Sequence, residues 1–299
     1  NISGKKKQKY LSICTAIGYL LHDYRIQSNA KAVVLYDEKI KNTDNPEGRT
    51  GKSLIGKAIE QIKNCSRIDG KNFDFRSSFT FQQVKLATKV IDFNDVQKDF
   101  DFERLFSVIT DAMTIEYKNK TPFEIPFSES PKIIISTNYS IKGVGSSYAD
   151  RMFEVGISDH YNPEHKPKDD FGHEFFTEWD DEEWNLFYEF MIYCIKLYLN
   201  KGLIKSEDPM LTNRKIINAT SVEFFEFAES FFSLDVKYDK KSMYNLFKTE
   251  IGYGNDMWDK CPVKQKTFTE YIKDYAEYKG YKYKDNRSNG SDYFTLSDK

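Results

Sequence analysis

The apolar positions of the chain change their period repeatedly between residues 31 and 157. Short apolar runs, which predict strands, lie at 32–36, 88–93, 132–137 and 151–155. Helical spacing follows the first of these runs, with apolar residues at 54, 55, 58, 59 and 62. A second predicted helix contains Phe102, Leu105, Phe106, Ile109 and Met113. Strands that alternate with helices are typical of α/β proteins, in which a parallel sheet is covered on both faces.

The flanking regions have different patterns. A helix is predicted within residues 1–30, and another over 184–199, after a polar and acidic surface excursion near 158–182. Residues 215–299 contain three helical patterns followed by two short strands that meet at an Asn-Gly turn, Asn289-Gly290. Helices followed by such a hairpin predict a winged-helix-like α+β unit. We therefore expect an N-terminal helical segment (1–30), an α/β domain (31–205) and a winged-helix-like domain (215–299).

A β-hairpin is predicted just before the 132–137 strand. Residues 114–117 and 123–126 alternate apolar with polar side chains, and a polar segment that includes Lys118 and Lys120 separates them. Lysines on such a turn are either merely solvated or contact the backbone phosphates of a nucleic acid without reading its sequence.

The loop after the first strand carries the candidate chemistry. It has the sequence Asn-Pro-Glu-Gly-Arg-Thr-Gly-Lys-Ser over residues 45–53 and leads directly into the first predicted helix. In a P-loop, backbone N–H groups and the helix N-terminus surround the phosphates of a nucleotide, the lysine reaches the β and γ oxygens, and the serine holds Mg²⁺. Pro46 stands where the pattern has its first glycine. We expect nucleotide contacts from Gly48, Arg49, Thr50, Gly51, Lys52, Ser53 and Leu54.

Further polar residues end the later strands. Asp95 follows the 88–93 run, where a carboxylate can polarise water or hold the shell of a Mg²⁺ ion together with Asn94 and Ser53. Asn138 ends the 132–137 run, where an amide can orient the attacking water. Arg151 lies beyond a loop rich in glycine and serine, and is either an arginine finger or a surface salt-bridge residue.

These motifs resemble the series found in superfamily 3 helicases. The matching pieces are Gly-Arg-Thr-Gly-Lys-Ser, Val-Ile-Asp-Phe-Asn-Asp, Ile-Ile-Ile-Ser-Thr-Asn and Arg151, within about 32–157. The likeness is greatest to the helicase halves of phage and mobile-element primase–helicases. It implies an AAA+-like fold, ATP and Mg²⁺ as cofactors, a homo-oligomeric and hexameric ring, and single-stranded DNA drawn through the pore. It also implies that Asn138 is the sensor and that Lys118 and Lys120 grip the strand.

We therefore expect an ATP-dependent DNA helicase, with Lys52, Asp95, Asn138 and Arg151 as its catalytic residues. Two rival hypotheses remain at this point. One is an AAA+ ATPase that loads or remodels protein on DNA without unwinding it. The other is a nucleotide-dependent DNA-binding scaffold that serves at a replication origin and hydrolyses little ATP.

Composition narrows these expectations only slightly. The 299 residues carry a formal net charge of −2, so any contact with nucleic acid must be local. Four widely spaced cysteines suit reduced thiols in a cytosolic protein, and the resemblance to phage and mobile-element proteins implies the cytoplasm of a bacterial host. No apolar run is long enough to span a membrane. The chain begins at Asn1 rather than Met, so we expect a fragment of a longer protein with room for a primase domain before it. His160, His165 and His173 match no standard ligand spacing, and no structural zinc is expected there.

Overall fold

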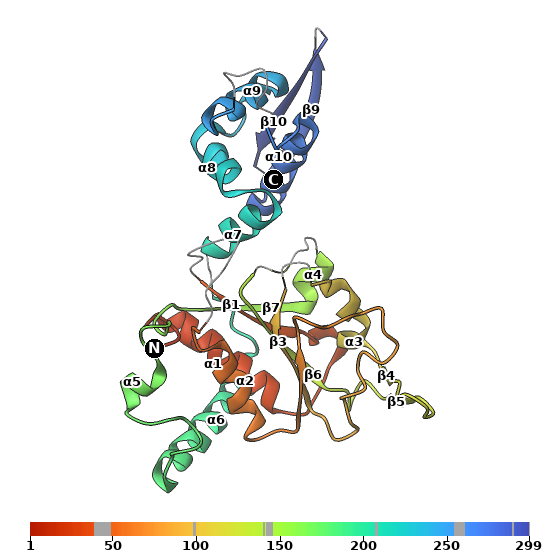
Figure 1. Ribbon diagram of the computed structural model, residues 1–299, viewed down its shortest axis with the longest axis vertical. Helices are drawn as coiled ribbons and strands as arrows, with labels where there is room; N and C mark the ends of the chain where they lie inside the picture. The colour runs from red at the N-terminus through yellow and green to blue at the C-terminus, as the bar shows by residue number, and fades with distance from the viewer. Residues whose placement is uncertain are drawn as a thin grey trace. The chain divides into compact units, whose positions relative to one another are not determined.

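The computed structural model describes residues 1–38, 49–97, 100–139, 141, 146–206, 209–253, 261–288 and 290–298. The chain divides into two compact units, Asn1–Asp208 and Pro209–Lys299 (Figure 1). Each unit has its own hydrophobic core, and each is described by itself.

A five-stranded parallel sheet forms the centre of the first unit, as the alternating pattern predicted. Its strand order is β2-β3-β6-β1-β7, and every neighbouring pair is parallel. The strands are β1 (Ala32–Asp37), β2 (Cys65–Asp69), β3 (Val90–Val96), β6 (Lys132–Thr137) and β7 (Met152–Ile157). Because parallel strands run in one direction, the residues that follow β1, β3 and β6 meet at the same edge of the sheet.

Both faces of the sheet are buried. Val33 and Leu35 of β1 belong to one core, whereas Ala32 and Val34 belong to the other, as expected when successive side chains point to opposite faces. Burial on both faces explains why β1 is a continuous apolar run. The helices whose residues join the first core are α1 (Lys7–Leu21), α2 (Lys52–Glu60) and α6 (Asp181–Lys201), on one side of the sheet in Figure 1.

The second core lies under short elements on the other face. These are η2 (Phe102–Leu105), α3 (Phe106–Thr110) and a two-stranded antiparallel sheet of β4 (Met113–Ile115) and β5 (Phe123–Ile125). The predicted hairpin is therefore present. The predicted helix that included Met113 is wrong at its end: the helix stops at Thr110, Asp111 is extended, and Met113 begins β4.

Several elements were not predicted from the sequence. They are β2, the 3₁₀ turn η1 (Gln27–Asn29), α4 (Ser146–Arg151), α5 (Pro167–Phe171), α7 (Pro209–Ala219) and β8 (Lys237–Asp239). The acidic excursion is also more than a surface loop. Tyr161 is 3 % exposed, and Phe176 and Trp179 pack against the first core. Arg151 ends α4 instead of beginning the last strand, which starts at Met152.

The described part of the second unit combines four helices with a small antiparallel sheet. After α7 come α8 (Val222–Phe231), β8 (Lys237–Asp239), α9 (Lys240–Glu250), α10 (Gln265–Lys279), β9 (Lys282–Ser288) and β10 (Ser291–Ser297). The sheet has the order β8-β10-β9. The β9–β10 hairpin matches the predicted pair of strands; Asn289 of its turn lies outside the described residues, and Gly290 has a φ of +78°. The phenylalanines Phe224, Phe247, Phe268 and Phe294 fill its core.

Two global expectations can be compared with the fold. All four cysteines are free thiols, and Cys14 and Cys194 are buried. Among the residues that the structure describes, no helix has the length and apolar character needed to cross a membrane.

Candidate functional site

A polar cavity of about 370 Å³ lies at the carboxyl edge of the parallel sheet. The N-terminus of α2 and the residues at the ends of β3 and β6 form its walls. Its lining contains Arg49, Thr50, Gly51, Lys52, Ser53, Lys71, Asn94, Asp95, Ser136 and Asn138. Most of the residues predicted for nucleotide and metal binding therefore meet in one place.

The start of α2 is built to present backbone donors to this cavity. Gly51 precedes the helix in the left-handed conformation, with a φ of +99°, and no side chain caps the helix. A side chain at Gly51 would be strained, since this conformation favours glycine. The first N–H groups of a helix have no partners within the helix, and together with the helix dipole they attract anions. The start of α2 is therefore suited to phosphate binding.

Lys52 lies at the centre of a chain of polar contacts. Its Nζ atom lies 2.5 Å from Asp37 Oδ1, at the end of β1, and donates a hydrogen bond of 2.9 Å to Asn138 Oδ1, after β6. Asn138 Nδ2 in turn donates to Asp95 Oδ1 at 3.1 Å. Asp37 also accepts a hydrogen bond from Thr50. Because β6 lies between β1 and β3 in the sheet, Asn138 can bridge the lysine and the acid.

A bulge in β3 directs Asp95 into the cavity. Phe93 pairs with Ile135 and Val96 pairs with Thr137, so that Asn94 and Asp95 together lie opposite the single residue Ser136. Asp95 has a φ of +58°, which is uncommon for a residue other than glycine, and its N–H donates to Ser136 Oγ at 3.0 Å. The Ser136 hydroxyl donates to Asn94 Oδ1 at 3.2 Å. Ser136 therefore holds Asn94 and Asp95, two of the three residues that were predicted to contact Mg²⁺.

Asp92 lies on β3, two residues before Asn94, and has a structural role. It is buried beside α2, pairs with Arg67 at 3.1 Å, and its Oδ2 lies 2.6 Å from the position that a Cβ at Gly56 would take. Burial raises the pKa of Asp92 above its ordinary value.

Besides Ser136, sequence reasoning missed three contributors to the site. Asp37 ends β1 and holds Lys52. The Nζ atom of Lys71 lies 2.6 Å from Asp95 Oδ2, and Gly70 accommodates the bulge. The hydrogen bond to Asp95 holds the pKa of Lys71 above its ordinary value. A Cβ at Gly70 would lie 2.6 Å from Val96 Cγ1. Of the three, only Asp37 had a sequence signal, as a charge that directly follows a buried strand.

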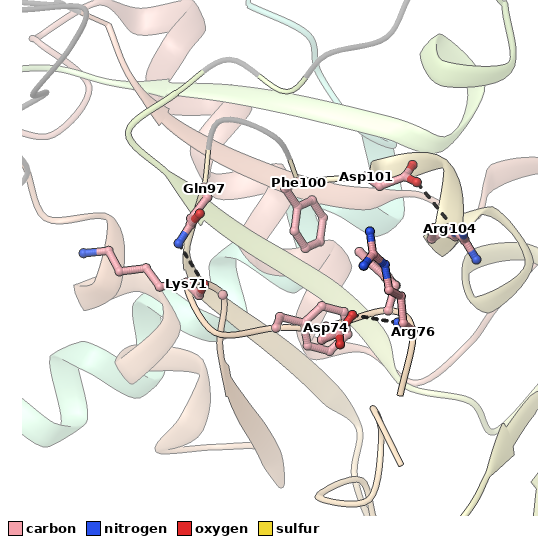
Figure 2. A pocket seen from close by; sticks show the side chains of 10 residues that line it. Lys71, Asp74, Arg76, Gln97, Phe100, Asp101 and Arg104 are labelled. Atoms are coloured by element: carbon pink, nitrogen blue, oxygen red, sulfur yellow. Dashed lines mark hydrogen bonds and ion pairs between the residues drawn. The ribbon is translucent and has the colours of Figure 1, made fainter. Parts of the chain in front are cut away.

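A second polar cavity adjoins the first, and the two share Lys71. It has a volume of about 310 Å³, and Figure 2 shows the Lys71 side chain extending away from Asp74, Arg76 and Arg104. Gln97 Nε2 donates to the Lys71 carbonyl at 2.8 Å and so fixes the backbone from which this lysine extends. The ammonium of Lys71 therefore serves the cavity that contains Asp95.

Arg151 lies at the opposite end of the sheet. The next residue, Met152, pairs with Ala32 at the start of β1, whereas Lys52 and Asn138 are gathered beyond the last residues of β1 and β6. Five residue steps of about 3.3 Å put about 17 Å of strand between the two ends. The guanidinium of Arg151 rests over the Phe106 ring, 4.8 Å from its centroid, and Nη1 donates to the Ser147 carbonyl. The structure does not bring Arg151 to the cavity of its own chain.

The remaining predicted residues also lie outside the cavity. Lys118 and Lys120 are exposed on the β4–β5 turn, which leads into the amino end of β6. Leu54 lines a separate apolar cavity of about 260 Å³. Gly48 lies outside the described residues.

The donor set of the cavity fits a nucleotide with Mg²⁺. Lys52 and the N-terminus of α2 offer positive charge and N–H donors, as phosphate oxygens require. The Ser53 hydroxyl, the Asp95 carboxylate and the Asn94 amide are oxygen ligands, which hard cations such as Mg²⁺ prefer. A bound phosphate would have to compete with Asp37 for Lys52.

Comparisons with known proteins give limited information. A family model described as "Family of unknown function (DUF5906)" matches residues 45–151. No curated protein matches the sequence.

Among solved structures, the chain is similar to the A form apo structure of the NrS-1 C terminal region, with 13 % sequence identity and a TM-score of 0.47. This match covers 98 % of the present chain and 75 % of the NrS-1 chain. A second structure of that region, CTR(305-718), is 14 % identical with a TM-score of 0.44, covering 99 % and 73 %. A JCV helicase bound to a thiazolopyridine acetamide is 12 % identical with a TM-score of 0.32, covering 84 % and 67 %. Function must therefore be inferred from the chemistry of the cavity.

Proposed function

We propose that the chain is the motor of an ATP-dependent DNA helicase of the superfamily 3 type, with an AAA+-like P-loop core. The observation that supports this most directly is the row of contacts that links Lys52, at the start of α2, to Asn138 and Asp95 at two neighbouring strand ends. A cation, an amide and a carboxylate within one polar cavity are the groups that phosphoryl transfer to water requires.

Each side chain has a definite task in this proposal. Lys52 exchanges Asp37 for the β and γ oxygens of ATP, and the N–H groups at the start of α2 hold the phosphates. Ser53, Asn94 and Asp95 hold Mg²⁺, whose charge neutralises part of the phosphate charge when it is bound. Asn138 orients the attacking water, and Asp95 accepts a hydrogen bond or a proton from that water.

The position of Arg151 supports hydrolysis at an interface between copies of the chain. Since about 17 Å of strand separates it from the cavity of its own chain, a catalytic role requires that it act on a neighbour. A guanidinium supplied by the next subunit stabilises the charge of the transition state. A homo-oligomeric ring, which we propose to be a hexamer, supplies such a contact at every interface.

Contact with single-stranded DNA is assigned to the turn between β4 and β5. Lys118 and Lys120 are exposed there and are not among the residues that line the nucleotide cavity, so they can bind DNA phosphates while ATP is bound. The second unit has the element order of a winged helix, with α8, β8, α9 and α10 before the β9–β10 hairpin. We assign it to a winged-helix-like domain.

The helicase proposal is tested with three activities measured on the same preparations: ATP hydrolysis, binding to single-stranded DNA, and displacement of a labelled strand. The wild-type chain is expected to show all three. Lys118→Ala/Lys120→Ala should keep ATP hydrolysis but lose strand displacement, because the motor no longer grips DNA. Hydrolysis without displacement in the wild type would indicate a loader, and DNA binding with negligible hydrolysis would indicate a scaffold. Either result would overturn the helicase proposal.

The trans role of Arg151 has a separate test. Arg151→Ala and Lys52→Met are each expected to reduce ATP hydrolysis by about 10³-fold or more, while Arg151→Ala still binds ATP. A mixture of the two variants should recover a measurable fraction of activity, because some interfaces then combine an intact Lys52 with an intact Arg151 from its neighbour. A mixture no more active than its components would remove Arg151 from the site.

A further inference from the structure

A second cluster of ligand-type side chains lies in the excursion after β7. His160, His165 and Asp170 are spaced five positions apart in the sequence, and their side chains converge on one point. His160 Nε2 lies 2.9 Å from Asp170 Oδ2, and His165 Nε2 lies 3.0 Å from Asp170 Oδ1. The two imidazole rings are nearly perpendicular, with centroids 5.1 Å apart. Two imidazoles therefore present the same nitrogen to the two oxygens of one carboxylate.

We propose that His160, His165 and Asp170 form a binding site for one Zn²⁺ ion, with water as the fourth ligand. Zinc bonds of 2.0–2.2 Å to nitrogen and oxygen place neighbouring ligand atoms of a tetrahedron about 3.3 Å apart. The two nitrogen–oxygen distances are only a few tenths of an ångström shorter, and all three ligand atoms lie within 4.8 Å of one another. A small rearrangement of side chains is enough to admit the ion.

Local structure holds the three ligands in place before any metal arrives. Asn162 and His165 form a backbone bridge, and Asn162 Oδ1 accepts hydrogen bonds from the N–H groups of Glu164 and His165. Asp170 belongs to the short helix α5. Just before this helix, the N–H group of Lys166 donates to Asp169 Oδ2 at 2.7 Å, and the N–H group of Asp169 donates to the Lys166 carbonyl at 2.9 Å. Preorganised ligands reduce the entropy that metal binding would otherwise cost.

A neighbouring polar group supports the carboxylate. Asn1 Nδ2 donates to Asp170 Oδ2 at 2.7 Å and orients this ligand from outside the cluster. Such outer contacts commonly accompany metal ligands. The ligand types also indicate the metal: imidazole suits zinc and other late first-row ions, and hard Mg²⁺ prefers oxygen ligands alone.

The site lies next to the proposed phosphate loop, which suggests what the ion stabilises. Tyr161, between the two histidines in sequence, has its Cδ2 atom 3.6 Å from the position that a Cβ at Gly51 would take. A metal that joins residues 160 and 170 keeps Tyr161 against the start of α2. The inference does not depend on the proposed function, because zinc binding is measured without nucleotide or DNA.

The chain offers a matched control in its third neighbouring histidine. His173 lies 2.9 Å from Glu183 at the start of α6 and is not part of the cluster. His173→Ala therefore removes an imidazole from the same excursion without removing a proposed ligand.

The test is an equilibrium titration of the metal-free 299-residue chain with Zn²⁺ in competition with a chromophoric chelator. The wild type and His173→Ala should bind one Zn²⁺ with the same affinity. His160→Ala/His165→Ala and, separately, Asp170→Asn should weaken binding by more than about tenfold. Circular dichroism establishes that each variant is folded, and these side chains are partly exposed, so the substitutions are expected to be tolerated.

Cobalt provides a second and independent readout. Co²⁺ bound at this site should show the visible bands of a four-coordinate nitrogen and oxygen site without a thiolate charge-transfer band. A thiolate band would assign the metal to cysteines and overturn the proposal. It would equally be overturned by a wild-type chain that binds no Zn²⁺, or by a double histidine variant that binds it as tightly as the wild type.

Discussion

The ion pair between Lys52 and Asp37 makes the most informative single prediction. Both side chains are buried, at 8 % and 5 % exposure, and Nζ lies 2.5 Å from Oδ1. Lys52→Met tests the proposal that Lys52 binds phosphate. Here it would also leave a buried carboxylate without its ammonium, so loss of activity could have two causes.

The expected magnitudes separate these causes. Removing one member of a buried pair costs about 3–5 kcal/mol, because the remaining charge has lost its compensation. Lys52→Met should therefore lower the free energy of unfolding of the first unit by about 3 kcal/mol. The double variant Lys52→Met/Asp37→Asn removes both charges and keeps an oxygen that can accept from Thr50. Its stability should lie within about 1 kcal/mol of wild type, so the coupling energy is at least about 2 kcal/mol.

Urea unfolding measures this cycle in the first unit. Trp179 and Trp184 both lie there, and a Trp258→Phe background removes the one other tryptophan of the chain. ATP hydrolysis is then measured on the four proteins of the cycle: wild type, Lys52→Met, Asp37→Asn and the double variant. The double variant should be as stable as wild type yet inactive, which assigns the loss to phosphate binding. Additive effects on stability would show that Lys52 and Asp37 do not pair in the free protein and would refute the geometry of the site.

Three further predictions concern groups that position the site or support the sheet. Gly70→Ala introduces a Cβ that would lie 2.6 Å from Val96 Cγ1 and 2.8 Å from the Asn94 carbonyl oxygen. We therefore expect the free energy of unfolding, measured in urea, to fall by about 1–3 kcal/mol and ATP hydrolysis to be slower. Wild-type values for both would mean that the bulge does not depend on glycine. Lys71→Ala removes an exposed ion pair with Asp95, so the free energy of unfolding should change by less than about 1 kcal/mol while ATP hydrolysis falls. Unchanged hydrolysis would exclude Lys71 from the site. Burial lowers the pKa of Lys132 from 10.5 to about 7, so the folded protein releases this proton near pH 7 while the unfolded chain keeps it to about pH 10. Wild-type stability should therefore rise between pH 7 and 10 relative to Lys132→Met, by at most about 4 kcal/mol; parallel urea midpoints for the two proteins at pH 7, 8 and 9 would contradict this.

Much of the parallel sheet could be predicted from local patterns. The apolar runs that became β1 and β6 are continuous because both faces of these strands are buried, and this composition is visible without a structure. β2 was missed because Cys65–Asp69 lies at the sheet edge and has only two buried residues, Ser66 and Ile68. The helix before β4 was predicted too long because Met113 continues its apolar spacing, although its side chain faces the core from a strand.

The candidate site likewise combines residues that could be predicted from sequence with contacts that could not. Lys52, Asp95 and Asn138 could be proposed from sequence because each directly follows a predicted strand or opens a predicted helix. The bulge that turns Asp95 could not be proposed, because it depends on Ser136 in another strand and on the close approach of Gly70. Lys71 follows the strand that sequence analysis missed.

Local sequence patterns were enough to predict the alternation of strands and helices, many of the apolar faces that build the cores, and the chemical types of side chain near the start of α2. These depend on the order of neighbouring residues, and local periodicity expresses that order directly. The three-dimensional fold was needed to find that Asp37 holds Lys52, that Arg151 lies at the far end of the sheet, and that two histidines converge on Asp170. Such contacts depend on strand order, register and loop path, which involve residues that are distant in sequence and leave no local pattern.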